Sequence, residues 1–541
     1  MTKWIPSRIL LLTLTCAMLS APVAWGWGTR AQRSLTVMAM HVLKEHHPNA
    51  FKSEETNFER DVLTGCTDGH AALNRTVLLN SDRESVLAVG TEIQLLRHVK
   101  QYGMGSYFAY RMGVLSSLVA DVMLPFGFTW SEQEQAIQKQ IEKDIEGHLD
   151  AYGYSVRQRH REYIRDARNY FEKRRAFYAE DKRIIKNDYL TGVGYQGFLN
   201  EAGPAYFVHS VEAVADAWHT VLRRQGDPSD NMPSKRLLTW YFVDEIDYLL
   251  TVKHNLRQAD KVYRHFEAVN PEMPQAYERL GDLYYAFDSE ESRMRGVHEW
   301  SKAHSLGGPE RPRIAAKLAE HYIEEGQKHL EEASRPGAPD DALPNALHAF
   351  ETALDLDRTN DEAASLIQET HVRIRERKER YEMVLSIIAT GEKVQEEAEK
   401  ARLNGDFGNA LRTYRQAISF FEAVDDEFRD QYDYAKETIR SLKKSITDVI
   451  NEVLDRASDA IDDGERAKEE HKYEEAIASY QKVWGIVNVI PDDENPDLVE
   501  EKNDIIALAE RTIEEAKVPR IRYEEAKAEQ GRAARERAGN R

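Results

Sequence analysis

Asp121 is the residue whose surroundings in the sequence most clearly demand a chemical partner. It interrupts residues 113–128, the most apolar segment of the predicted first domain at residues 27–225, and this segment is too short to span a bilayer. We therefore expect residues 113–128 to form a buried central helix. A carboxylate on a buried helix is costly unless it is paired with another group or bound to a cation. The sequence predicts such a partner for Asp121.

The elements that must position this carboxylate are helices. The chain has 541 residues with only 29 Gly and 17 Pro, and it is rich in residues that favour helix. Apolar residues of its first part recur at helical spacing, and alternating runs typical of strands do not occur there. One predicted helix carries Leu35, Met38, Ala39, Val42 and Leu43. We predict an all-α protein with more than one domain.

The charge of the chain limits its partners. Asp and Glu number 93 and Lys and Arg number 73, which gives a formal net charge of −20. This balance opposes the attraction that a general nucleic-acid binder needs. We therefore do not expect a nucleic acid as a bound scaffold.

Residues 1–26 have the features of a secretory signal peptide. Lys3 and Arg8 supply the positive start, and residues 9–19 form an apolar stretch that is too short to cross a membrane. We therefore predict an exported protein, periplasmic or secreted, with no transmembrane segment in the mature chain.

The predicted cleavage site follows Gly26. Ala24 and Gly26 are the small residues that signal peptidase requires, and cleavage there leaves Trp27 as the mature N-terminus. Cleavage after Ala24, which would leave Trp25, is the alternative.

Residues 226–234 contain the turn-forming sequence Gly-Asp-Pro-Ser-Asp-Asn-Met-Pro-Ser. We place a domain boundary there, between a helical domain at 27–225 and a repeat region at 236–515. Residues 516–541 are polar and basic, and we expect them to form a frayed helix or a solvated tail.

The first domain contains an ordered set of marker residues. Trp27-Gly28 precedes a predicted helix, Asp68 follows, and the buried helix with Asp121 is followed by Pro125. This order resembles the superfamily of bacterial zinc-dependent phospholipases C and fungal single-strand nucleases. The resemblance implies an all-α domain whose zinc ions hydrolyse phosphodiesters and whose N-terminal Trp binds zinc through its α-amine and carbonyl. Removal of the signal peptide would create that ligand.

The chain departs from this family at the histidine ligands. The family's central helix carries His, then Asp four residues later, then His six residues further. Around Asp121 these histidines are replaced by Ser117 and Gly127, and Gln32 replaces the histidine expected five residues after Trp27. None of the three is a good zinc ligand.

The resemblance leaves five ligand positions: Trp27, Asp68, His98, Asp121 and Asp144. Asp68 matches the family's early Asp, His98 would supply a histidine to the same site, and Asp144 matches a carboxylate whose paired histidine is missing. The family implies zinc, whereas this oxygen-rich set suits one magnesium, calcium or manganese ion. We predict at most one tightly bound divalent metal ion. If the domain is active, it is a metal-dependent phosphoric ester hydrolase.

The second half of the chain repeats one spacing five times. A small residue is followed four positions later by a large ring and three positions further by another apolar residue, which places all three on one helix face. The five rings are Tyr263, Trp300, Phe350, Tyr414 and Tyr480. These segments resemble tetratricopeptide repeats. The resemblance implies an α-solenoid of paired helices that binds a protein or peptide ligand in its groove.

The period of these segments is longer than in that repeat family. Ala346, Ala410 and Ala476 are separated by 64 and 66 residues, about twice the usual ~34. Residues 360–404 and 429–463 contain no proline. Each could form one long helix or a second, degenerate helical pair.

Two functions follow from these features. The leading hypothesis is an exported protein-interaction scaffold that carries a catalytically degenerate phospholipase C-like domain, a pseudoenzyme. The alternative is a working metal-dependent phosphodiester hydrolase, of phospholipase C or nuclease type, whose repeats serve for targeting. The missing histidines favour the scaffold.

Overall fold

The computed structural model describes residues 26–52, 57–73, 79, 81–151, 160–223, 232–287, 289–335, 337–493 and 495–539. Apart from Gly26, the predicted signal peptide lies outside these residues, as do residues 226–231 of the predicted linker. The described part of the chain consists of helices α2 to α20 and short 3-10 helices, without strands. The prediction of an all-α protein is confirmed. None of the described helices is long and apolar enough to cross a membrane.

The chain divides into two compact units, Met1–Ala315 and Ala316–Arg541. The division lies inside helix α14 (Arg311–Ala333), whereas sequence analysis placed a boundary at residues 226–234. The helices that follow residue 234 therefore pack within the first unit, which we call unit 1. The second is unit 2.

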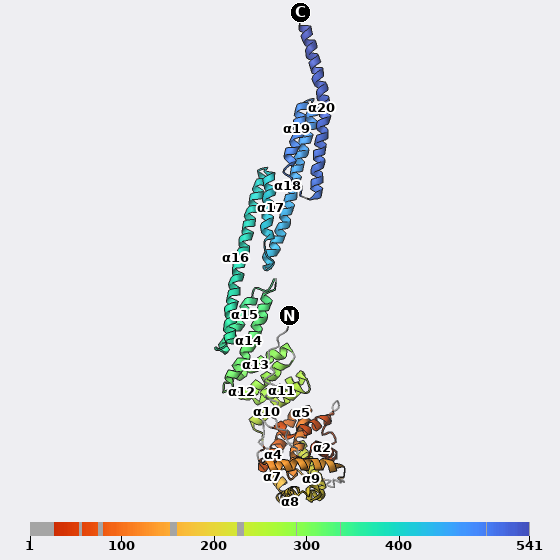
Figure 1. The fold of residues 1–541 in the computed structure, drawn as a ribbon, viewed down its shortest axis with the longest axis vertical. Helices are drawn as coiled ribbons and strands as arrows, with labels where there is room; N and C mark the ends of the chain where they lie inside the picture. Colours follow the sequence, from red (N-terminus) through yellow and green to blue (C-terminus); the bar gives the residue numbers. More distant parts are fainter. Residues whose placement is uncertain are drawn as a thin grey trace. The chain divides into compact units, whose positions relative to one another are not determined.

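Unit 1 begins with eight helices that lie together in Figure 1. They are α2 (Thr29–Lys44), α3 (Glu59–Asp68), α4 (Asp82–Val99), α5 (Ser106–Met123), α6 (Glu132–His148), α7 (Ala167–Arg174), α8 (Tyr178–Leu190) and α9 (Phe198–Leu222). Four more helices follow: α10 (Lys235–Thr251), α11 (Leu256–Val269), α12 (Pro274–Ala286) and α13 (Glu290–Leu306).

Helix α5 is the core of unit 1, because every residue from Tyr107 to Met123 is buried. The apolar run at residues 113–128 predicts a buried central helix, but α5 begins earlier, at Ser106, and ends at Met123, so residues 124–128 are buried without being helical. Gly113 allows α5 to cross α3 closely, since a Cβ atom at that position would overlap the carbonyl oxygen of Val62. The indole of Trp218 donates a hydrogen bond to the Met112 carbonyl oxygen at 2.8 Å, which attaches α9 to the same helix.

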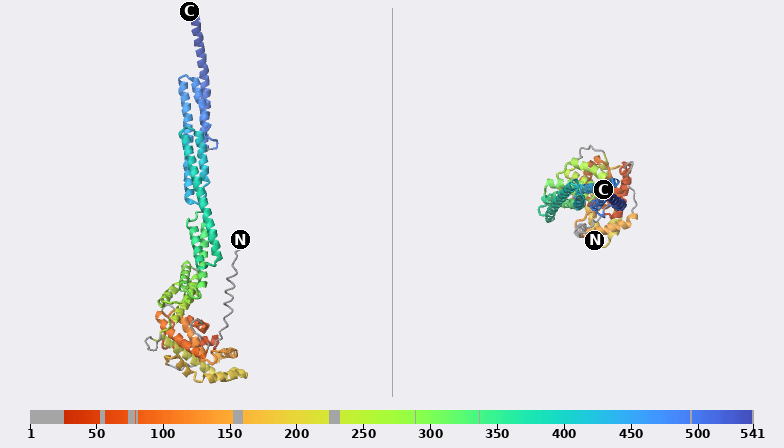
Figure 2. Two further views of the ribbon diagram at one scale, coloured as in Figure 1. Left: turned by 90° about the vertical axis from the view of Figure 1, so that its left-hand side faces the viewer. Right: turned by 90° about the horizontal axis from the view of Figure 1, so that it is seen from above.

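Unit 2 is built from helical hairpins. After the end of α14 come α15 (Ala342–Leu356), α16 (Asp361–Leu403), α17 (Phe407–Glu422), α18 (Arg429–Glu469), α19 (Tyr473–Val487) and α20 (Pro496–Gly539). Both α16 and α18 are single long helices, which decides between the two alternatives that the sequence left open. Helices α16, α17 and α18 run side by side in Figure 1, and the turned view in Figure 2 agrees.

Helix α20 contains the start of the predicted tail. It continues through Pro519 to Gly539, and residues 521–535 are all exposed. Residues 516–539 are therefore helical in this structure.

Candidate functional site

The predicted mature N-terminus lies beside Asp121. Trp27 is buried, and its indole nitrogen donates a hydrogen bond to the Ala120 carbonyl oxygen at 3.0 Å. A Cβ atom on Gly26 would lie 3.1 Å from Asp121 Oδ1. The structure thus brings together two of the five residues that the family resemblance selects.

Two of the residues that replace the family's histidines lie in the core. Gln32 and Ser117 are buried, and their side-chain polar atoms form no hydrogen bond with any other described residue. Burial raises the pKa of the Cys66 thiol to about 11, and the charge of Asp121 adds to this shift. On α6, burial and then the neighbouring charges of Glu146 and Asp121 raise the pKa of Glu142. Sequence analysis missed Glu142 because no family position points to it.

Asp68 is the last residue of α3, and it contacts α5 at a different point from Asp121. Its Oδ2 atom accepts a hydrogen bond from the Tyr110 hydroxyl at 3.0 Å. Tyr110 precedes Asp121 by 11 residues on the same helix, a distance of about 16 Å along the axis. One metal ion cannot bridge two carboxylates so far apart.

His98 and Asp144 have other neighbours. The His98 Nε2 atom lies 3.1 Å from Gln101 Nε2, and burial lowers the pKa of His98. Asp144 accepts a hydrogen bond from the Tyr189 hydroxyl at 2.9 Å.

The positions of these residues show whether they could form the zinc centre that the resemblance implies. Within the described ranges, no three His, Cys, Asp or Glu side chains are grouped so that they could hold a metal ion. The five residues do not fit a zinc centre, and we derive no catalytic step through one.

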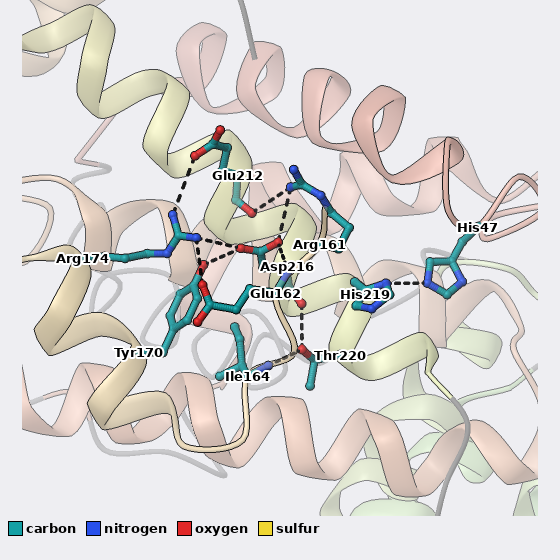
Figure 3. A network of polar contacts seen from close by, with 10 residues as sticks. All are labelled: His47, Arg161, Glu162, Ile164, Tyr170, Arg174, Glu212, Asp216, His219 and Thr220. Carbon is teal, nitrogen blue, oxygen red and sulfur yellow. Dashed lines mark hydrogen bonds and ion pairs between the residues drawn. The ribbon is translucent and has the colours of Figure 1, made fainter. Parts of the chain in front are cut away.

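A buried polar cluster on α9 is centred on Asp216 (Figure 3). Its Oδ1 atom accepts a hydrogen bond from the backbone N–H of Glu162 at 3.0 Å and lies 3.4 Å from Arg161. Its Oδ2 atom accepts hydrogen bonds from the Tyr170 hydroxyl at 2.9 Å and from Arg174 at 3.0 Å. Burial raises the pKa of Asp216, and these donors oppose the shift.

This cluster attaches the segment before α7 to α9. Thr220 accepts a hydrogen bond from the backbone N–H of Ile164 at 2.9 Å, and Glu212 lies 3.7 Å from Arg174. Glu212, Asp216 and Thr220 are spaced by four residues, which places them on one helix face. That spacing is the signal that could have revealed the cluster. Both carboxylate oxygens of Asp216 accept hydrogen bonds from residues of this cluster, which supports a structural role for it.

Two histidines face each other near the same network. The Nε2 atom of His47, three residues after the end of α2, lies 2.9 Å from the Nδ1 atom of His219 on α9 (Figure 3). Burial first and the neighbouring His47 second lower the pKa of His219 to about 4. Both rings are therefore neutral at pH 7.

The five rings of the repeated spacing are buried: Tyr263, Trp300, Phe350, Tyr414 and Tyr480 are each at most 5% exposed. Three of them lie directly against a glycine of the preceding helix, and a Cβ atom on Gly281 would overlap the Trp300 ring. A Cβ atom on Gly326 would lie 2.5 Å from the Phe350 ring, and one on Gly464 would overlap the Tyr480 ring. These glycines let the paired helices approach closely.

Two hairpins of unit 2 repeat the same contacts 66 residues apart. In the first, the Tyr414 hydroxyl on α17 donates a hydrogen bond to Glu399 on α16. In the second, the Tyr480 hydroxyl on α19 donates a hydrogen bond to Glu465 on α18 at 2.7 Å. The ring and the carboxylate are 15 residues apart in both.

The turns of these hairpins also match. Gly405 has φ 77° and His471 has φ 61°, so both lie in the left-handed region. The residue after each donates its backbone N–H to the fifth residue before it, Asp406 to Ala401 at 2.9 Å and Lys472 to Ala467 at 2.8 Å. The 66-residue spacing is thus a structural repeat of one hairpin.

A cavity of about 570 Å³ lies in unit 2, between the α14–α15 connection, α16 and the α17–α18 connection. Arg377 crosses it, with its guanidinium 3.0 Å from Asp340 and 5.9 Å from the centre of the Phe428 ring. Apolar and charged side chains share the lining, among them Leu343, Ile374, Tyr381, Lys378 and Glu427.

Comparison with known proteins adds no support to the resemblances to phospholipases C and tetratricopeptide repeats. No family model matches the chain, and a search of curated proteins finds no match.

Proposed function

We propose that this protein is an exported protein-interaction scaffold. The hairpins of unit 2 would bind a protein or peptide, and the N-terminal helical domain would be a catalytically degenerate relative of the zinc-dependent phospholipases C. The observation that carries the proposal is the hairpin repeated at 66 residues, with the same Tyr–Glu hydrogen bond and the same left-handed turn residue. Repeated helical hairpins form extended surfaces that bind polypeptides.

The cavity in unit 2 is the binding position that we favour. Tyr381 and Phe428 offer ring surfaces, while Arg377 and Glu427 offer opposite charges on the same lining. Such a mixture of apolar anchors and a few placed polar groups is typical of ligand and peptide sites.

The surroundings of Asp121 support a degenerate domain. Gln32 and Ser117 replace histidines that the family uses, and Asp68, on α3, contacts α5 at Tyr110, three helical turns from Asp121. The domain would then serve as a folded platform, with Trp27 as an anchor in its core.

Site-specific photo-crosslinking tests the binding position. A photoreactive phenylalanine replaces Tyr381 in the cavity or, as a control, Met383, which is 64% exposed and does not line the cavity. In the native host we expect one discrete crosslinked partner from position 381 that is lost with Arg377→Ala. Equal crosslinking from both positions, or none from position 381, would contradict the proposal.

N-terminal sequencing of the exported protein tests the processing step. We expect the sequence to begin at Trp27, because this residue is already seated against α5. A start at Trp25, or an uncleaved Met1, would contradict our explanation of Trp27.

A further inference from the structure

Unit 1 contains a second cavity of about 340 Å³, formed by residues 102–107 and by one face each of α10 and α11. On α10 the lining residues are Tyr241, Glu245 and Leu249, spaced by four. On α11, Lys261 and His265 are also spaced by four. Because residues four apart share a helix face, both helices present a continuous strip to this cavity.

The walls of the cavity are aromatic. The rings of Tyr107 and Tyr241 are buried, and their centres lie 5.2 Å apart. Tyr102 is 38% exposed at the mouth, with its ring centre 5.0 Å from that of His265. The cavity is thus buried at its floor and open at one side.

Glu245 is the acidic residue of this lining. No other described residue forms a hydrogen bond or ion pair with it, and burial alone raises its pKa to about 8. Burial and then the charge of Glu245 raise the pKa of Tyr241, so the phenol and the carboxyl group are neighbours. A partly buried carboxyl group without a partner is costly, and a ligand that pairs with it recovers this free energy.

The basic residues near this cavity do not compensate Glu245. Lys261 is exposed at the mouth and does not offset the effect of burial on Glu245. Burial and the charge of Arg264 lower the pKa of His265.

Arg111, which lies next to two of these tyrosine rings, already has Glu92 as its ion-pair partner. Arg111 contacts the rings of Tyr107 and Tyr241 but donates two hydrogen bonds to Glu92, at 2.9 and 2.6 Å. Aromatic faces attract cations, and the net charge of −20 raises the concentration of cations near the protein.

We propose that this cavity binds an alkylammonium group, with the Glu245 carboxylate as its ion-pair partner and the rings of Tyr102, Tyr107 and Tyr241 as its walls. The group belongs either to a lysine side chain of a partner or to a free polyamine, since both present the same chemistry. The site lies within unit 1 and does not depend on the hairpins proposed to bind a partner in unit 2.

Calorimetric titration of the full mature chain with n-butylammonium tests the site, with n-butanol and butyrate as neutral and anionic controls. We expect saturable binding of n-butylammonium alone, weakened at least ~10-fold by Glu245→Ala. Lys261→Ala should strengthen binding, because it removes a like charge from the mouth. Glu267→Gln, which neutralises an exposed carboxylate on the same helix, should leave it unchanged.

The pH dependence gives a second measurement. The ligand binds the ionised carboxylate, so each binding event below pH 8 releases a proton from Glu245. The affinity should rise ~10-fold from pH 6 to pH 7 and level off above pH 8. Glu245→Gln keeps the size of the side chain and should remove this dependence, which keeps the test decisive even if Glu245→Ala does not fold.

Two further ligands distinguish the sources of the cation. Tighter binding of N-acetyl-lysine N-methylamide would identify a lysine side chain, and tighter binding of spermidine would identify a free polyamine. Preference for butyrate, or n-butylammonium binding that survives both Glu245 variants, would overturn the proposal.

Discussion

Buried charges in unit 1 are held by specific partners. Arg111 on α5 is fully buried, and it donates two hydrogen bonds to the side chain of Glu92 on α4. Asp216 has Arg161 and Arg174 as partners in the same way. Removing one member of such a pair leaves the other charge uncompensated, which costs about 3–5 kcal/mol. These pairs therefore fix how α4, α5, α7 and α9 pack.

The His47–His219 pair makes the stability of unit 1 depend on pH. The pKa of His219 falls from 6.5 in the unfolded chain to about 4 in the folded one. Between these values the unfolded state binds more protons, so stability decreases as the pH falls from 6.5 towards 4.

We expect the midpoint of thermal unfolding, followed by tryptophan fluorescence, to decrease over this range. His219→Gln should reduce the slope, whereas His41→Gln, at an exposed position of α2, should not. An unchanged slope in His219→Gln would show that other groups cause the pH dependence.

The hairpin turns of unit 2 differ at one equivalent position. Gly405 adopts its left-handed conformation without a steric cost, whereas His471 has a Cβ atom in the same conformation. We predict that His471→Gly raises the free energy of unfolding by about 0.5–1 kcal/mol. Gly405→Ala should lower it by roughly 1 kcal/mol.

Urea denaturation followed by circular dichroism measures both turn variants. The His471 ring also contacts Tyr473 and Tyr523. A loss of stability in His471→Gly would mean that these ring contacts outweigh the backbone strain.

The buried rings should carry much of the stability of the hairpins. Phe350 is fully buried between α14 and α15 and lies against Gly326. Phe350→Ala should therefore cost about 3–5 kcal/mol, and Tyr414→Ala a similar amount.

The matched control for these variants is Met383→Ala on α16, which is 64% exposed and should change stability by less than about 0.5 kcal/mol. If Phe350→Ala behaves like this control in thermal unfolding, the repeat spacing does not define the packing there.

Local spacing predicted much of the architecture. Regular apolar spacing indicated the all-α class and the buried helix around Asp121, and the four-then-three spacing indicated which rings are buried. Such features depend on residues close in the sequence, so one sequence is enough to find them.

Contacts between residues far apart in the sequence could not be predicted from local spacing. Tyr241 on α10 packs against Tyr107 on α5, which places the first helices after the linker within unit 1. Likewise, Asp68 and Asp121 match one family pattern, yet Asp68 contacts Tyr110, far from Asp121 on the same helix. The spacing of single residues does not indicate which ends of the helices meet.

The whole molecule, in our account, binds a partner and does not hydrolyse phosphodiesters. In this account, Gln32 and Ser117 take the places of histidine ligands that the family resemblance implies, and Asp68 contacts Tyr110, away from Asp121. Metal content and turnover can be measured on the same mature protein, purified without chelator.

Turnover of phosphatidylcholine and of single-stranded DNA with added zinc, by the mature protein and its Asp121→Asn variant, tests this account most directly. We predict no turnover above the zinc-containing buffer for either protein. We also predict lower stability for Asp121→Asn, because Asp121 is buried in the core of unit 1. Robust turnover by the unmodified protein that Asp121→Asn abolishes would contradict our account and establish the hydrolase.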